Sequence, residues 1–130
     1  MRGERQRRTI LRVLIVDDST AMRMMIRKTL KDAGYEAHDY TEATDGSDAL
    51  EIVRDTPPDL VLSDWNMPTM NGIDLLKSIQ SEGIPTKLGF ITTESTIAMR
   101  KQANDAGALF VITKPFTVES FQSALDPILG

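Results

Sequence analysis

The chain has 130 residues, a formal net charge of −4 and no cysteine. This fits one soluble globular domain and excludes a disulfide framework or thiolate chemistry. A single histidine excludes a multi-histidine metal site, and no apolar run approaches the roughly 20 residues of a membrane-spanning helix. Residues 1–12 carry +4, so the remaining residues carry −8. That acidic body argues against nucleic acid as the main partner.

Residues 1–10 are predicted to be a disordered basic arm, and residues 11–130 to form one domain with no further module after it. The arm lacks the apolar segment of a secretory signal. A contact of the arm with a partner or a membrane is the alternative to a solvated arm.

Five strands and five helices are predicted to alternate. Continuous apolar runs such as 13–16 are typical of strands buried on both faces of a parallel sheet. The predicted strands cover residues 11–16, 36–41, 59–64, 86–92 and 109–113. The predicted helices begin near Ser19, Asp45, Asn71, Ser95 and Thr117. Strands and helices that alternate over short connections predict an α/β fold. We expect a doubly wound, five-stranded parallel sheet with helices on both faces and the flavodoxin-like strand order 2-1-3-4-5.

The first helix is predicted to bury a stripe that includes Met22, Met25, Ile26 and Leu30, with Gly34 as its end. Methionines at this spacing are expected to serve the core rather than a cofactor.

Polar side chains follow four of the predicted strands. Asp17 and Asp18 end the first, Asp64 the third, Thr92 the fourth and Lys114 the fifth. The carboxyl ends of parallel strands meet at one rim, which is where ligands bind in open α/β sheets. Each of these residues has an ordinary structural explanation when taken singly, as a cap, a turn residue or a solvated lysine. Their coincidence at one rim favours a site.

Three clustered carboxylates repel one another, since two like charges 4 Å apart cost roughly 4 kcal/mol at an effective dielectric near 20. Lys114 supplies one positive charge, and a divalent cation would supply the rest. Oxygen ligands favour a hard ion. Mg²⁺ fits better than Ca²⁺ because the chain has no EF-hand-type loop. A carboxylate beside such a metal can act as a phosphoryl acceptor, so we expect Asp64 to take a phosphoryl group and Thr92 to hydrogen-bond one of its oxygens.

These motifs together resemble the receiver domain of two-component response regulators. The resemblance covers residues 11–129 and rests on Asp17-Asp18, on Ser63 to Pro68 with Asn71-Gly72, on Ile91-Thr92-Thr93, and on Lys114-Pro115-Phe116. Since we expect no output module to follow, the chain most resembles the stand-alone, chemotaxis-type (CheY-like) members.

The resemblance implies a role for each site residue. Asp64 would accept a phosphoryl group from a histidine kinase or its phosphotransfer domain. Asp18, Asp64 and the backbone carbonyl of Asn66 would bind Mg²⁺ directly, and Asp17 would hold a metal-bound water. Lys114 would pair with Asp64 or its phosphoryl group, and the Lys114-Pro115 bond would be cis. Thr92 would move towards the phosphoryl group.

The resemblance also implies a cytoplasmic signalling protein rather than an enzyme acting on other substrates. Its downstream target would be a flagellar switch, a phosphatase or a kinase, with neither nucleic acid nor membrane as a partner. Asn66 and Glu94 stand where family members tune their own dephosphorylation, and this polar and acidic pair predicts a short-lived phosphorylated state.

One position departs from the family pattern. Many receiver domains carry an aromatic residue three positions before the lysine, and here that position is Val111. An aromatic rotamer switch is therefore excluded at Val111. The signal is expected to be carried by Thr92 and the loop before the fourth helix, or by another residue. The output surface would comprise the fourth helix, fifth strand and last helix, with Met99, Arg100 and Lys101 as candidate contacts.

The sequence bears on three other functions that an α/β fold could serve. A flavodoxin-type protein needs a phosphate loop after the first strand, where Asp17-Asp18 would repel a phosphate in the absence of a metal. An aspartyl phosphatase would need a second acid just after the nucleophile to protonate the leaving group, but Trp65 and Asn66 occupy those positions. A receiver-shaped adaptor that is never phosphorylated stays open as the alternative.

Overall fold

The computed structural model describes residues 11–35 and 39–129. Its five strands are β1 (Arg12–Val16), β2 (Asp39–Ala43), β3 (Leu60–Ser63), β4 (Lys87–Thr92) and β5 (Val111–Thr113). Its helices are α2 (Thr20–Asp32), α3 (Gly46–Asp55), α4 (Gly72–Ser81), α5 (Ile97–Ala106) and α6 (Val118–Leu129). The predicted arm, residues 1–10, lies outside the described residues.

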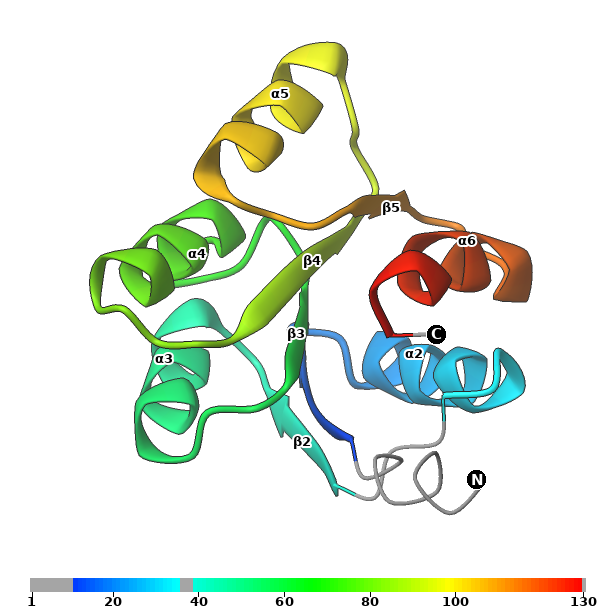
Figure 1. Ribbon diagram of the computed structural model, residues 1–130, viewed down its shortest axis with the longest axis horizontal. Coiled ribbons are helices and arrows are strands. Elements are labelled where there is room, and N and C mark those ends of the chain that lie inside the picture. The colour runs from blue at the N-terminus through cyan, green and yellow to red at the C-terminus, as the bar shows by residue number, and fades with distance from the viewer. Residues whose placement is uncertain (1–10, 36–38, 130) are drawn as a thin grey trace, which may run out of the picture.

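All strand pairs are parallel, in the order β2-β1-β3-β4-β5. Helices α2 and α6 cover one face of the sheet, and α3, α4 and α5 cover the other (Figure 1). The predicted doubly wound fold and strand order are confirmed. β1 and β3 are central and almost wholly buried, as their continuous apolar runs indicated.

The polar residues that begin the helices act as caps. The side chains of Ser19, Asp45, Asn71 and Thr96 each accept a hydrogen bond from a backbone N–H in the first turn. α5 ends at Gly107, whose φ of 100° is the left-handed conformation that glycine adopts without strain. The N-caps fix where each helix begins after the preceding strand, and therefore where the side chains at the rim lie.

Two predictions were wrong in detail. β2 lies further along the chain than predicted, at Asp39–Ala43, and residues 36–38 of the predicted range lie outside the described residues. Met25 was predicted to face the core but is 53% exposed. It lies about 100° around the helix from Ile26, so it points beyond the edge of the narrow buried stripe. The fully or nearly buried residues of α2 are Arg23, Ile26 and Leu30.

Within residues 11–35 and 39–129, no helix combines the length and the apolar character needed to cross a bilayer.

Candidate functional site

Asp17 and Asp18 stand where β1 ends and the turn into α2 begins. The Asp17 N–H donates to the Ala43 carbonyl of β2 at 3.1 Å, and its carboxylate accepts from the Ser19 N–H at 2.9 Å. Asp17 is 2% exposed. Asp18 is exposed, and its carboxylate has no hydrogen-bond or ion-pair partner among residues 11–35 and 39–129. The strand end thus holds one carboxylate inside the fold and presents the other to solvent.

Asp64 follows β3 in the same way. Its N–H donates to the Val16 carbonyl of β1 at 2.9 Å, and its carboxylate accepts from the Trp65 N–H at 2.7 Å. The turn that follows packs tightly on α4, because a Cβ at Gly72 would lie 2.4 Å from the Asp64 carbonyl oxygen. Only glycine allows this close approach. The predicted Asn71-Gly72 turn therefore packs against the backbone of Asp64 and holds it in place.

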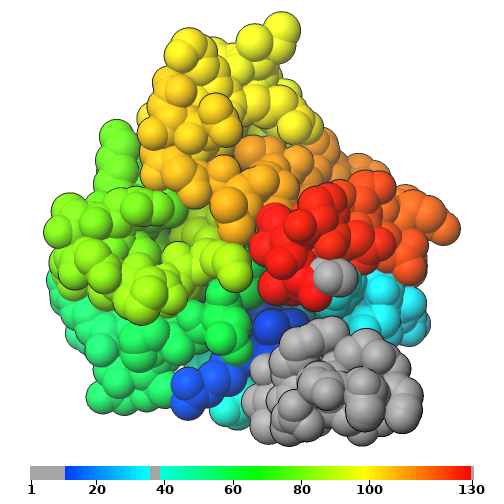
Figure 2. Space-filling model, viewed as in Figure 1, coloured from blue at the N-terminus to red at the C-terminus, as the bar shows by residue number. Residues whose placement is uncertain are grey.

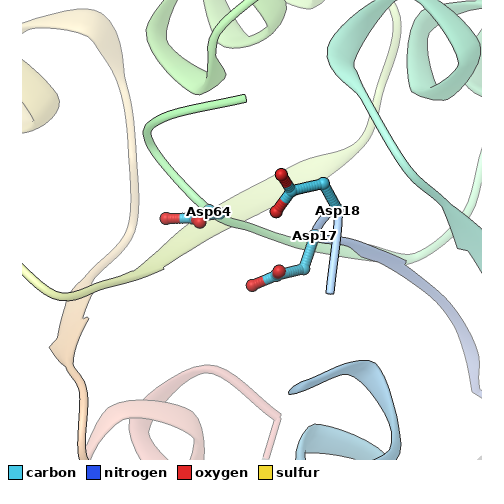
Figure 3. A group of neighbouring side chains, drawn as sticks. All are labelled: Asp17, Asp18 and Asp64. Carbon is cyan, nitrogen blue, oxygen red and sulfur yellow. The ribbon is translucent and has the colours of Figure 1, made fainter. Parts of the chain in front are cut away.

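The three carboxylates gather at one place on the rim. Figure 3 shows Asp17 and Asp18 beyond β1 next to Asp64 beyond β3. One carboxylate oxygen from each lies within 4.8 Å of those of the other two. The pKa of Asp64 is raised from its ordinary value, first by burial and also by the charge of Asp17, whereas Lys114 and the Trp65 N–H act in the opposite direction. A cation at this place would relieve that repulsion, and an all-oxygen donor set suits Mg²⁺.

Lys114 binds two of the three carboxylates. Its ammonium nitrogen lies 2.8 Å from Asp17 Oδ2 and 3.4 Å from Asp64 Oδ2, and its side chain is only 10% exposed. The resemblance implied a partnership with Asp64, but the shorter contact is to Asp17. The Lys114-Pro115 peptide is cis, as expected. Lys114 therefore links the ends of β5, β1 and β3.

Thr92 ends β4 and is completely buried. Its hydroxyl has no hydrogen-bond partner in the part of the chain that the structure describes. A buried polar atom left unpaired costs about 1–3 kcal/mol, so it calls for an explanation. The Thr92 carbonyl accepts from the Lys114 N–H at 2.8 Å, which places both residues at neighbouring strand ends. This unpaired hydroxyl could donate a hydrogen bond to an oxygen atom of a group bound at the rim.

Asn66 and Glu94 are exposed on the turns that follow β3 and β4. Each stands two residues after a rim residue, Asp64 or Thr92. The structure thus brings Asp17, Asp18, Asp64 and Lys114 together directly, and Asn66 and Glu94 belong to turns beside them.

Several residues of the predicted output surface make contacts within the fold. Val111 is half-buried on the α5 side, while the Phe110 ring lies over Gly89, where a Cβ would meet it at 2.1 Å. Arg100 donates to Ser95 Oγ at 3.1 Å and to Thr113 Oγ1 at 3.3 Å. Met99 packs against the core, so it is a poorer candidate contact than the exposed Arg100 and Lys101.

Sequence reasoning missed one residue close to the rim. Arg23 is 9% exposed, and its guanidinium donates to the Asp17 carbonyl oxygen at 2.6 Å. A signal was present, because Arg23 precedes Ile26 by three residues and Leu30 by seven and so lies on the buried face of α2. A charged residue on an apolar face indicates a specific partner.

The family is shown by comparison with known proteins. The family model described as response regulator receiver domain matches residues 13–126, so the chain belongs to this family. The chain is 39% identical to chemotaxis protein CheY1 of Helicobacter pylori, covering 92% of this chain and 98% of that protein. It is 40% identical to chemotaxis protein CheY of Thermotoga maritima, covering 90% and 96%.

Solved structures agree with this assignment. The structure of Vibrio cholerae chemotaxis protein CheY4 matches with a TM-score of 0.80 and 33% identity, covering 92% of this chain and 99% of that one. The chain is therefore a CheY-like receiver domain, a class of two-component signalling protein. Receiver domains of this class bind Mg²⁺ and interact with histidine kinases and downstream targets in general.

Proposed function

We propose that this chain is a response regulator in which Asp64 accepts a phosphoryl group from a histidine kinase or its phosphotransfer domain, in the cytoplasm. The observation that supports this most is the rim itself. Three carboxylates have oxygens within 4.8 Å of one another, and the Lys114 ammonium bonds two of them. Three clustered carboxylates repel one another, so this arrangement is costly unless cations neutralise them. A cation held there would also neutralise charge on a transferred phosphoryl group.

The donor set fits Mg²⁺. Asp18 and Asp64 would hold the ion together with the Asn66 carbonyl, and Asp17 would hold a water bound to it. When bound, the ion neutralises charge on the transferred phosphoryl oxygens.

The chain's own residues supply the remaining steps. An Asp64 oxygen attacks phosphorus while the P–N bond to the donor imidazole breaks, and the imidazole leaves with the electron pair of that bond and takes up a proton. Lys114 remains near both Asp17 and Asp64 and can bond a phosphoryl oxygen. Thr92 supplies the hydroxyl that has no partner in the resting fold. Its movement towards the phosphoryl group would shift the loop before α5 and so change the surface offered to a downstream target, which would be a flagellar switch, a phosphatase or a kinase.

Trp65 provides the test. Trp65 is 8% exposed, its ring centroid lies 4.8 Å from that of Phe90, and its backbone N–H donates to the Asp64 carboxylate. We expect a saturable fluorescence change on Mg²⁺, then a reversible change on acetyl phosphate with one phosphoryl group added by intact mass. Asp64→Asn should lose the donor response and the mass gain. A wild-type chain that binds Mg²⁺ but takes no phosphoryl group from acetyl phosphate or from phosphohistidine donors would instead support the adaptor function.

The lifetime of the phosphorylated state tests the roles of Asn66 and Glu94. Both side chains are exposed beside the rim, where they can hydrogen-bond the water that attacks the phosphoryl group. Asn66→Met or Glu94→Leu should slow dephosphorylation by about tenfold, which is a barrier change of about 1.4 kcal/mol. Decay of the phosphorylated protein after removal of donor measures the rate, and an unchanged rate in both variants would contradict the assignment.

A further inference from the structure

Arg23 lies directly beneath the turn that carries Asp17 and Asp18. It belongs to the first turns of α2, whose N-cap is Ser19, and its N–H donates to the Ser19 carbonyl at 3.0 Å. Side chains on a helix lean towards the helix N-terminus. The Arg23 side chain therefore reaches back under the β1–α2 turn, and it is only 11% exposed.

Three nitrogens of this guanidinium donate to three different groups. Nη1 donates to the Asp17 carbonyl oxygen at 2.6 Å, Nε to Glu42 Oε1 at 2.7 Å, and Nη2 to Thr20 Oγ1 at 3.2 Å. Glu42 comes from β2, so the fork joins β2, the β1–α2 turn and α2. The hydrogen bond from Arg23 is the largest of the influences that lower the pKa of Glu42.

The Asp17 contact constrains the peptide that leads to Asp18. The Asp17 N–H donates to Ala43, and its carboxylate accepts from Ser19 and Lys114. Arg23 fixes the remaining polar group of Asp17, its carbonyl. Because a peptide is planar, fixing this carbonyl also fixes the direction in which the chain enters Asp18. The Asp18 carboxylate itself is exposed and has no partner among the described residues.

Stability alone is a poor explanation for this arrangement. The Arg23 side chain is 11% exposed and that of Glu42 is 30% exposed, and an ion pair largely withdrawn from water is often no more stabilising than apolar side chains of similar volume. A methionine or leucine at position 23 would continue the apolar stripe of Ile26 and Leu30. An arginine there needs a partner for its charge, which Glu42 provides. The shortest of its hydrogen bonds goes to the Asp17 carbonyl, in the β1–α2 turn of the site.

We propose that Arg23, anchored on Glu42, is a positioning residue that orients the Asp17–Asp18 peptide so that the Asp18 carboxylate stands beside Asp64 for metal binding. The inference rests on the proposed function, since it assigns Arg23 to the geometry of the same Mg²⁺ site. Removing groups that orient metal ligands costs 10- to 100-fold in metal affinity.

The test is a Mg²⁺ titration followed by Trp65 fluorescence. Arg23→Lys keeps the positive charge but loses the planar fork that reaches Glu42 and Asp17 together. We expect about tenfold weaker Mg²⁺ binding in this variant. The matched control is Arg27→Lys. Arg27 also bonds Glu42, at 3.0 Å, but its hydrogen bonds and ion pairs do not include Asp17 or Asp18. Its affinity should change by less than twofold.

A second measurement separates positioning from general loosening. The rate of phosphorylation by acetyl phosphate is followed against Mg²⁺ concentration. In Arg23→Lys the half-saturating Mg²⁺ concentration should rise about tenfold, while the rate at saturation changes less than twofold. A variant that is merely loosened would lose rate at saturation as well. If Arg23→Lys does not fold, Glu42→Gln weakens the anchor of the guanidinium and should raise the half-saturating concentration a few-fold.

The outcomes distinguish the inference from the function beneath it. A normal wild-type Mg²⁺ response with unchanged affinity in the folded Arg23 or Glu42 variant contradicts the positioning role alone. The same holds if Arg27→Lys weakens binding as much as Arg23→Lys. A wild-type chain that does not respond to Mg²⁺ overturns both the proposed function and the role of Arg23.

Discussion

α4 and α5 have ten residues each and cover the same face of the sheet, yet they are attached very differently. α4 buries five residues, including Leu75, Leu76 and Ile79, whereas the only buried residue of α5 is Ala103. Ile97, at the start of α5, is 88% exposed. Figure 2 shows α5 and the loop before it as a projection at the top of the molecule. The chain thus fixes the backbone of Asp64 on a firmly packed helix and leaves the helix that follows Thr92 free to shift at low cost.

Truncating one side chain in each helix should give the largest difference in stability between α4 and α5. Leu76 is fully buried, so Leu76→Ala should lower the free energy of unfolding by about 4 kcal/mol through lost burial and a residual cavity. Met99 of α5 is only partly buried, and Met99→Ala should cost about 1 kcal/mol. Urea unfolding measures both. Equal losses would show that α5 is packed as firmly as α4.

A second pair of substitutions compares how much a lysine contributes to stability at the rim and on α5. Lys114→Met leaves the buried Asp17 carboxylate, whose side chain is 3% exposed, without its cation. Metal-free stability at neutral pH should fall by about 3 kcal/mol, and Mg²⁺ should restore part of it. On α5, Lys101 pairs with the exposed Asp105 and with no other residue in 11–35 and 39–129, so Lys101→Met should change stability by about 0.5 kcal/mol or less. Thermal unfolding with and without Mg²⁺ provides the comparison, and a stable Lys114→Met protein would contradict it.

Thr92 lies between the two regions, and its substitution should separate stability from response. Because its buried hydroxyl has no partner among the described residues, Thr92→Val should leave resting stability unchanged or raise it by about 1 kcal/mol. The phosphorylation-dependent change in amide exchange of α5 should disappear, and Thr92→Ser, which keeps a hydroxyl, should retain it. A Thr92→Val protein with a full α5 response would mean that the signal reaches α5 by another route.

The smallest effect concerns the charge of Asp64. Its pKa is raised in the fold, so the folded protein binds this proton more tightly than the unfolded chain does. The charged carboxylate therefore destabilises the metal-free fold at neutral pH, and this cost fades as the pH falls through the folded pKa towards the ordinary value of 3.8. Asp64→Asn should be the more stable protein at pH 7 without Mg²⁺, with an advantage that shrinks on acidification. A difference that stays constant with pH would contradict the raised pKa.

Much of the fold and of the candidate site was predictable from local patterns. Apolar runs and helical spacing depend on which residues are neighbours in sequence, so they identified every strand and helix. Ser19 was correctly predicted as the cap of α2, whereas the cap of α5 is Thr96, next to the predicted Ser95. The same logic placed Asp17, Asp64, Thr92 and Lys114 at strand ends, and parallel strands bring such ends to one rim. The edge strand β2 was less exact, because its half-polar sequence lacks the continuous apolar signal of β1 and β3.

Other features depend on contacts between segments far apart in the chain. Lys114 lies closest to Asp17, the Thr92 hydroxyl is left without a partner, and Arg23 is buried against Glu42 and the Asp17 carbonyl. The sequence alone determined which chemical groups stand on the rim, because residue order fixes where each strand ends. Only the tertiary structure decided their pairing and the light attachment of α5, because distances and burial are set by how the helices pack on the sheet.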